Sequence, residues 1–97
     1  YNVVAFHSDV SKKKEQEELV QFAVAEFGQI DVFVNNAGVD AVSPILDITE
    51  DELDKLFHIN VYGTLFGIQA AAKQFIKQVK VKSSTHVVLQ DMNLMRY

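Results

Sequence analysis

The sequence predicts an α/β fold, with a partial doubly wound parallel sheet in which a βαβ unit precedes a long bent helix. Two short apolar runs, residues 3–6 and 30–34, are rich in β-branched and aromatic residues, which is typical of buried strands. Between them, over residues 12–27, apolar residues recur every three or four positions, as on one face of a helix. The same spacing continues over residues 53–79, which would make a helix about 40 Å long.

The predicted βαβ unit covers residues 3–34. Ser11 is the expected N-cap of its helix, although Lys14, three positions later, provides no capping box. Gly28 follows the last apolar residue of the helix, as expected for a residue that ends it in a left-handed conformation. Because a helix connects the two strands, they should be parallel and their crossover right-handed.

The second half of the chain is predicted to be helical. Thr49 and Glu52 have the spacing of a capping box, and the acidic first turn suits the positive end of the helix dipole. Asn60 and the pair Gly63 and Gly67 mark where we expect a bend or a close approach between helices. The two glycines favour helix packing, within the chain or between subunits, over ligand contact.

Composition excludes several classes of function. The 97 residues allow one domain, and a net charge of −4 argues against nucleic acid or an anionic membrane as a partner. The absence of cysteine excludes disulfides and thiolate metal sites, and it fits a reducing cytoplasm. His7, His58 and His86 lack metal-ligand spacing, so we expect no metal. No apolar run reaches the roughly 18 residues needed to cross a membrane.

Three short motifs stand in a definite order along the chain: Asp9-Val10, then Asn35-Asn36-Ala37-Gly38 after the second strand, then Asn60-Val61 in the long helix. This order resembles the central third of the short-chain dehydrogenase/reductase family over residues 4–79. Any one motif is a weak signal, whereas three at family-like spacing are specific. The resemblance implies that residues 1–80 are the central part of a Rossmann-type dinucleotide-binding domain.

The resemblance also implies a set of site residues. In this family the helical Asn belongs to the proton relay behind the catalytic lysine, which implies a catalytic role for Asn60. The implied cofactor-binding residues are Asp9, Val10, Asn36, Ala37, Gly38 and Val61. No metal ligand is implied.

Each motif has a structural alternative. Asp9, at a strand's carboxyl end, would accept a hydrogen bond from an adenine amino group, or it simply caps the following turn. Residues 35–38 would join neighbouring strand ends and let a ribose approach the small Ala-Gly surface, or they form an ordinary turn. Asn60 would hold a water on a freed carbonyl, or it is a satisfied residue of a helix bend.

Within the family, residues 67–71 and Pro44-Ile45 resemble the branch of acetoin (diacetyl) reductases and butanediol dehydrogenases. That resemblance implies an NAD(P)-dependent oxidoreductase of diacetyl- or acetoin-like carbonyls and alcohols, with NAD(H) favoured over NADP(H). It further implies a cytoplasmic homo-oligomer that associates through the long helix.

Several parts of the family pattern are missing. The Gly-rich turn that binds pyrophosphate would lie before Tyr1, where the chain starts without an initiator Met. The catalytic Ser is absent, and so is a Tyr followed four residues later by Lys: Ala5 follows Tyr1 and Phe66 follows Tyr62 at that spacing. We therefore expect a fragment that is inactive alone or, alternatively, a non-catalytic subunit that associates with a full-length homologue.

Residues 81–97 form an atypical tail where the family has a buried strand and the catalytic Ser. Codons compatible with residues 80–97, read from the third base of the Lys80 codon, yield GKIINACSIAGHESYAL, which resembles that missing segment. The hypothesis is that the tail is a frameshift product. The encoding DNA tests this hypothesis, because codons incompatible with that string would remove it.

Topology predicts that the sheet of this chain is poorly covered. In the family's strand order, two absent strands separate residues 3–6 from residues 30–34, a gap of roughly 14 Å. The chain must then pair these strands directly or leave apolar faces uncovered on Phe6, Phe22, Phe33 and the long helix. Either outcome predicts marginal stability or association.

Overall fold

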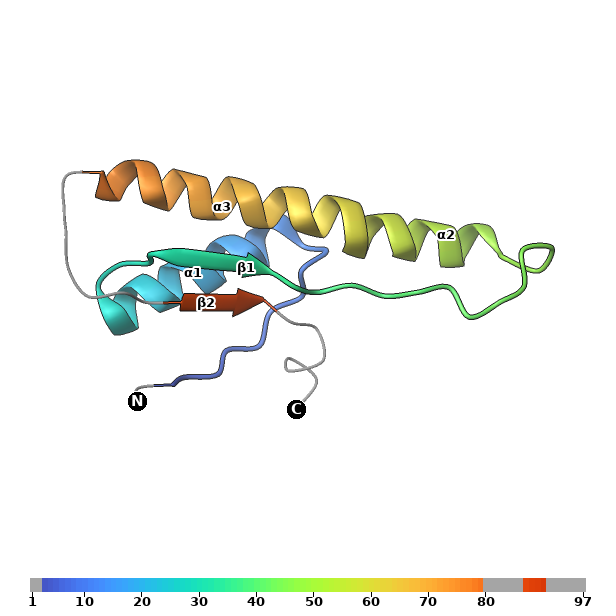
Figure 1. Cartoon of the computed structure of the whole chain (residues 1–97), viewed down its shortest axis with the longest axis horizontal. Helices are drawn as coiled ribbons and strands as arrows, with labels where there is room; N and C mark the ends of the chain where they lie inside the picture. Colours follow the sequence, from blue (N-terminus) through green and yellow to red (C-terminus); the bar gives the residue numbers. More distant parts are fainter. Residues whose placement is uncertain (1–2, 80–86, 91–97) are drawn as a thin grey trace.

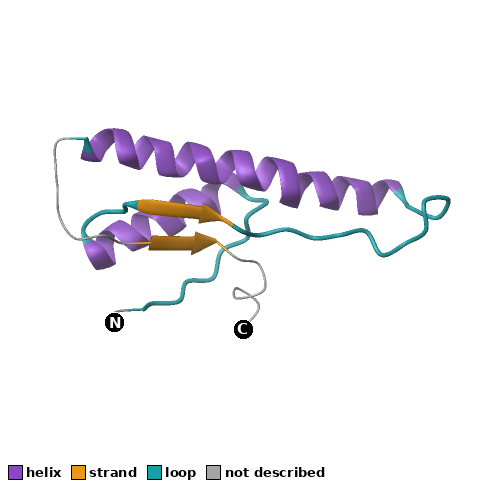
Figure 2. Ribbon diagram, in the orientation of Figure 1, coloured by secondary structure: helices purple, strands orange, loops and turns teal. Residues whose placement is uncertain are grey.

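A computed structural model of the chain describes residues 3–79 and 87–90 (Figure 1). Its elements, in order, are α1 (Lys13–Phe27), β1 (Val32–Asn35), α2 (Glu50–Phe57), the π-helical segment η1 (His58–Tyr62), α3 (Gly63–Gln78) and β2 (Val87–Gln90). The segments α2, η1 and α3 run as one long helix, and α3 packs against α1 and β1. The loop after β1 runs beside this helix to the far end of α2 (Figure 2).

The sheet has two parallel strands in the described residues. β1 pairs with β2 in a register that runs from Val32 opposite Val87 to Asn35 opposite Gln90. The chain therefore contains two parallel strands connected through helices, but these strands are β1 and β2 rather than residues 3–6 and 30–34. The strand expected over residues 30–34 is present with its bounds shifted to Val32–Asn35. β2 itself lies in the atypical tail, whose remaining residues are outside the described ranges.

The prediction of a buried strand over residues 3–6 is wrong. This segment is extended but belongs to no ladder, and Val3 is 86% exposed. The physical reason is that a strand needs a neighbour for its backbone groups, and the ladder in the described residues joins only β1 and β2. The segment packs over α1 through Phe6, whose ring stacks on Phe22 with centroids 4.5 Å apart. Direct pairing of the two predicted strands therefore does not occur.

Helix α1 covers almost all of the predicted residues, 12–27, but its N-cap is not the predicted Ser11. Its N-cap residue is Lys12, and no side chain among the described residues caps it, because the Ser11 hydroxyl is bonded to Asp9 instead. The predicted end is confirmed. Gly28 has a φ of +88°, and its N–H donates to the Val24 carbonyl at 2.7 Å.

The long helix begins with the predicted capping box. The Thr49 hydroxyl accepts from the Glu52 N–H at 3.1 Å, and the Glu52 carboxylate accepts from the Thr49 N–H at 3.0 Å. Near Asn60, where a bend was expected, the helix passes into the π-helical segment η1. There the N–H of Gly63 donates to the carbonyl of His58, five residues earlier, and α3 follows.

The core lies where α1, α3 and β1 meet, and small residues of α3 form its centre. The core residues are Leu19, Val20, Ala23, Ile30, Ala70 and Ala71. A Cβ at Gly67 would lie 3.0 Å from the ring of Phe33 and would clash with Oδ1 of Asn35. At Gly63 it would lie 3.1 Å from the Val10 side chain. The two glycines therefore serve packing within the chain, as the sequence favoured.

Glutamine side chains complete the attachment of α3 to the start of β1. The carboxamide of Gln78 accepts from the Ile30 N–H at 2.9 Å and donates to the Ile30 carbonyl. Gln74 donates to the same Gln78 oxygen at 2.7 Å. Ile30 is fully buried, so these bonds satisfy backbone groups that water cannot reach. The predicted lack of coverage holds only for the long helix, because Phe6, Phe22 and Phe33 are half-buried.

Candidate functional site

The three sequence motifs converge on one stretch of the long helix, from Asn60 to Gly67. Val10 packs on Gly63, Val39 is bonded to Asn60, and Asn35 lies against Gly67. These contacts join segments that are far apart in the sequence. The carboxyl end of β1 and the loop that contains Asp9 therefore lie on the same part of the helix.

Asp9 occupies a tight turn ahead of α1. Its Oδ1 accepts from the backbone N–H of Ser11 at 3.0 Å and from the Ser11 hydroxyl at 2.7 Å. The Asp9 N–H donates to the Glu15 carboxylate at 3.0 Å. The turn-capping alternative is therefore realised. Both hydrogen bonds from Ser11 reach the same oxygen, however, so the second carboxylate oxygen keeps its capacity to accept.

The Asn35–Gly38 motif begins where β1 ends. Oδ1 of Asn35 is buried and has no hydrogen-bond partner within residues 3–79 and 87–90. Ala37 is half-buried, while Asn36 and Gly38 are exposed. A Cβ at Gly38 would lie 3.4 Å from Oδ1 of Asn60, so the backbone of Gly38 runs close to the long helix. The motif thus presents a backbone surface with little side-chain bulk.

Asn60 fixes the loop that follows this motif. Its Oδ1 accepts from the Val39 N–H at 2.9 Å, and its Nδ2 donates to the Val39 carbonyl at 2.7 Å. The Asn60 carbonyl accepts from the Thr64 hydroxyl at 3.0 Å. The side chain is thus satisfied, as the structural alternative expected. Val61, the other predicted residue of this motif, is 49% exposed.

Gln16, which was not predicted as a site residue, is fully buried between these segments. Its Nε2 donates to the Val10 carbonyl at 2.7 Å and to the Gly63 carbonyl at 2.5 Å. A signal was available: Gln16 stands three and four positions before Leu19 and Val20, on the apolar face of the predicted helix. A polar residue at such a position needs a buried partner.

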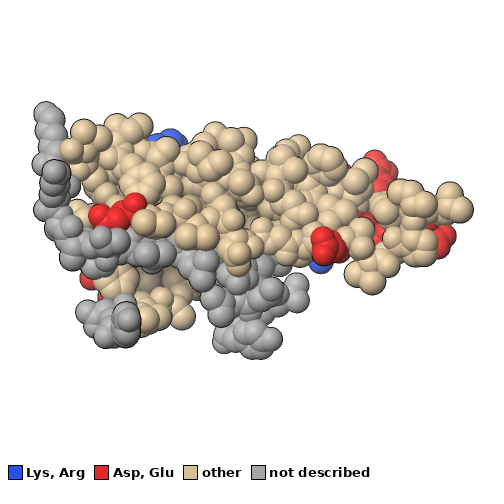
Figure 3. All heavy atoms as spheres, viewed as in Figure 1, with Lys and Arg blue, Asp and Glu red and all other residues tan. Residues whose placement is uncertain are grey.

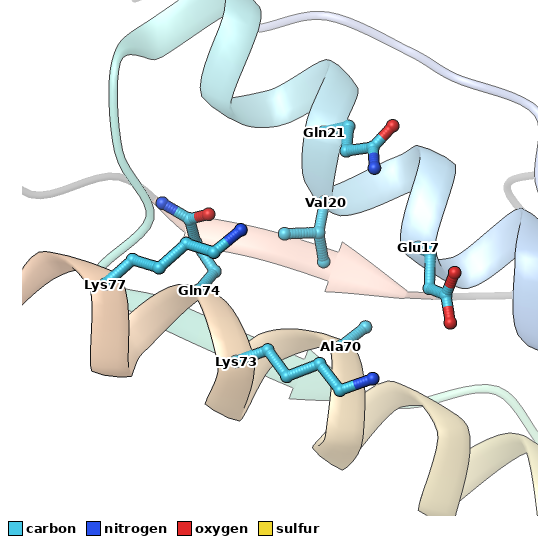
Figure 4. Close-up of a pocket in the computed structure, with 7 residues that line it drawn as sticks. All are labelled: Glu17, Val20, Gln21, Ala70, Lys73, Gln74 and Lys77. Atoms are coloured by element: carbon cyan, nitrogen blue, oxygen red, sulfur yellow. The ribbon is translucent and has the colours of Figure 1, made fainter.

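A hollow of about 160 Å³ lies between α1 and α3 (Figure 4). Glu17, Val20 and Gln21 line it from α1, and Ala70, Lys73, Gln74 and Lys77 line it from α3. None of the predicted site residues lines it. Within the described ranges no group of three metal-ligating side chains comes together. No helix in the described part of the chain is long and apolar enough to span a membrane.

Three acidic residues, Glu50, Asp51 and Glu52, occupy the first turn of α2. Acidic side chains are visible at that end of the molecule, while much of the surface along α3 in the same view is uncharged (Figure 3). Hydrogen bonds from the Ser43 hydroxyl and the Thr49 N–H lower the pKa of Glu52, and burial opposes this only in part. The lowered pKa of Glu52 thus results from the contact with Ser43 and from the capping box.

Comparison with known proteins gives consistent matches. The sequence profile of the family described as short chain dehydrogenase matches residues 1–88. A diacetyl reductase [(S)-acetoin forming] of Staphylococcus epidermidis is 82% identical over 78 residues, which are 80% of this chain and 30% of that protein. An L-2,3-butanediol dehydrogenase of Corynebacterium glutamicum is 39% identical over 69% of this chain and 26% of its own length.

Solved structures agree with these matches. A mutant short-chain dehydrogenase/reductase of Serratia marcescens superposes with a TM-score of 0.70 at 32% identity, over 75% of this chain and 30% of that one. A short-chain dehydrogenase of Novosphingobium aromaticivorans gives 0.74 at 27% identity, over 90% and 32%. The chain spans about a third or less of the length of the relatives it matches.

Proposed function

The chain belongs to the short-chain dehydrogenase family, and we propose that it is a segment of a nicotinamide-dependent reductase of diacetyl, acetoin or similar small carbonyl compounds. The 82% identity to a diacetyl reductase over 80% of the chain supports this substrate class. The observation that carries the proposal is the convergence of the three motifs on the stretch from Asn60 to Gly67. Residues that would share one cofactor need to be neighbours in space, and these are.

The residues fit a nicotinamide dinucleotide in two respects. Asp9 keeps an acceptor oxygen that would bind an adenine amino group beside the backbone of Val10. Asn36, Ala37 and Gly38 offer a backbone surface of low bulk, against which a ribose would lie. When bound, the cofactor supplies the hydride that reduces the carbonyl. We propose NAD(H) in preference to NADP(H) by resemblance to the reductase branch.

Asn60 would act on the proton side of the reaction. Its carbonyl lies in the π-helical segment η1, where the helix bonding is irregular, and we propose that it would hold a water in the relay. Its carboxamide, bonded to both backbone groups of Val39, would keep the Gly38 loop at a constant distance from that water. Val61 would line the cofactor site through its half-exposed side chain.

Activity of the chain by itself provides the first test. The 97 residues contain no Tyr followed four positions later by Lys, so reduction would lack its proton donor. We expect no oxidation of NADH when the purified chain is mixed with diacetyl. The full-length S. epidermidis reductase, assayed in parallel, is the positive control. Diacetyl-dependent oxidation of NADH by the chain alone would contradict the expectation that it is inactive.

A second candidate function is a non-catalytic subunit that associates with a full-length homologue. Large apolar side chains on the long helix are about half exposed, and contiguous apolar surface of this kind marks interaction sites. They are Leu53, Phe57, Val61, Leu65 and Ile68. In a pull-down, we expect tagged chain to retain the S. epidermidis reductase and Leu65→Asp to abolish retention. Equal retention by both forms would reject this surface.

A further inference from the structure

The buried carboxamide of Gln16 joins two of the three site segments. Its single Nε2 atom donates to the carbonyl of Val10, next to Asp9, and to the carbonyl of Gly63, one helical turn after Asn60. Gln16 and Gly63 are 47 residues apart in the sequence. The side chain is fully buried, so neither carbonyl exchanges this donor for bulk water.

The chemistry of this junction is specific to a primary amide. An –NH₂ group carries two protons, and each can meet one of the two carbonyl oxygens without placing a charge in the core. A thioether of similar length donates nothing. An ionised carboxylate would place negative charge against two carbonyl dipoles, and a protonated one can donate to only one of them.

The contacts around Gln16 transmit its position to Asp9. Gly63 allows Val10 to approach, because a Cβ there would lie 3.2 Å from the Val10 carbonyl. The first turns of α1 hold the rest of the loop: the Ser8 hydroxyl donates to the Glu15 carbonyl, and the Glu15 carboxylate accepts from the Asp9 N–H. Asp9 in turn accepts from Ser11. Loop, α1 and α3 thus form one hydrogen-bonded unit.

We infer that Gln16 is a positioning residue of the cofactor site: it sets the place of the adenine-side carboxylate of Asp9 relative to the helix turn that carries Asn60. The inference rests on the proposed function for the identity of the ligand. Gln16 itself touches neither the cofactor nor the substrate. It acts through Val10 and Gly63, whose carbonyls it holds together.

The test uses the whole 97-residue chain with Gln16→Met and Gln16→Glu, and Gln21→Met as the matched control on the exposed face of α1. The first readout is the NMR signal of the Ser11 amide, whose N–H is bonded to Asp9. We expect Gln16→Met to move this signal at every pH. Gln16→Glu should move it at neutral pH and partly restore it in acid, as the introduced carboxyl becomes a donor. Gln21→Met should leave it unchanged.

The second readout is binding of AMP, a probe for the adenine side alone. We expect weak binding by the native chain, with a Kd of about 1 mM. Loss of two hydrogen bonds in Gln16→Met should raise the Kd roughly tenfold. Asp9→Ala should abolish binding with the Gly63 contact intact. The helical circular dichroism of each variant establishes that it folds.

The outcomes separate the inference from the proposed function. If AMP binds and Asp9→Ala abolishes binding, but both Gln16 variants bind normally, the positioning role is overturned and the proposed function stands. If the native chain binds no AMP while the Ser11 signal shows the pH-dependent pattern, the adenine site is rejected and the junction stands. If Gln16→Met leaves the Ser11 amide signal unchanged, the inference that Gln16 positions Asp9 is overturned.

Discussion

Helices α2 and α3 are parts of one continuous helix, yet they are held in opposite ways. α2 has a complete capping box and three acidic residues in its first turn, but none of its eight residues, all of them described, is buried. α3 starts at Gly63 and has no side-chain cap within the described chain, yet Gly63, Gly67, Ala70 and Ala71 are buried. The helix with the complete capping box, α2, is therefore the one with no buried residue.

The comparison separates two sources of helix stability. A capping box satisfies backbone donors within a single turn, so it works without any tertiary contact. Packing needs the backbones to approach, and the small residues of α3 allow Phe33 and Val10 to come within van der Waals distance of the helix. We therefore expect substitutions in α3 to change global stability, and substitutions in α2 to change only local order.

The largest effect is expected from Gly67→Ala. The new methyl group would meet the Phe33 ring and the Gln16 carboxamide oxygen and would clash with Oδ1 of Asn35, so these side chains must shift. Overpacking costs about 1–3 kcal/mol, against which the better helix propensity of Ala returns up to about 1 kcal/mol. The urea midpoint of a dilute sample, followed by circular dichroism, measures the difference.

Ile68→Ala is the control for this prediction. Ile68 neighbours Gly67 in sequence but is 52% exposed, so its loss should change the free energy of unfolding by no more than about 0.5 kcal/mol. If removing this large side chain destabilises the chain more than adding one methyl at Gly67, the packing account of α3 is wrong.

A smaller and local effect is expected from Thr49→Ala. Loss of the cap should cost about 1 kcal/mol of helix stability. Because α2 packs on little else, amide hydrogen exchange should accelerate roughly fivefold across Glu50–Phe57 and remain unchanged in α3. Thr64→Ala, a matched change within α3, should leave exchange in α2 unaltered. Equal acceleration along the whole helix would mean that α2 and α3 unfold as one unit.

The smallest effect concerns pH. The pKa of Glu52 is lowered, mainly by the Ser43 hydroxyl at 2.7 Å and then by the Thr49 N–H. A carboxyl with a lowered pKa in the folded state stabilises that state above its unfolded pKa, and the contribution is lost as pH falls through the folded pKa. Order in α2 should therefore decrease on acidification.

Ser43→Ala tests the cause of this shift. Removing the hydrogen bond from the Ser43 hydroxyl should raise the pKa of Glu52 toward its ordinary value and move the loss of order in α2 to higher pH. An NMR titration of the Glu52 carboxyl carbon measures both effects. An unchanged titration would assign the shift to the Thr49 N–H alone.

Features determined by neighbouring residues could be predicted from the sequence. The capping box at Thr49, the helix end at Gly28 and the irregular turn at Asn60 each depend on groups within a few positions. The order of the three motifs also identified the family, because it depends on residue identity rather than on packing. Fold class and family therefore followed from the sequence.

Features determined by distant partners could not be predicted. Residues 3–6 have the composition of a strand but gain no neighbour, while Val87–Gln90 gains β1. Gln16 is polar on an apolar face, and its two acceptors come from segments that only the folded chain brings together. The cap expected at Ser11 is an exception among local features: its hydroxyl bonds to Asp9, two residues earlier, because two local partners competed for it.

The helix that carries both halves of this comparison has two apolar stripes. Leu65 and Ile68 are about half exposed, whereas Gly67 and Ala70, each two positions later, are buried. Two positions correspond to about 200° around a helix, so the stripes lie on nearly opposite sides. A helix on the outside of a domain needs only one such stripe. One side of this helix is occupied by the sheet and α1, and the other carries the exposed apolar side chains that the second candidate function would use.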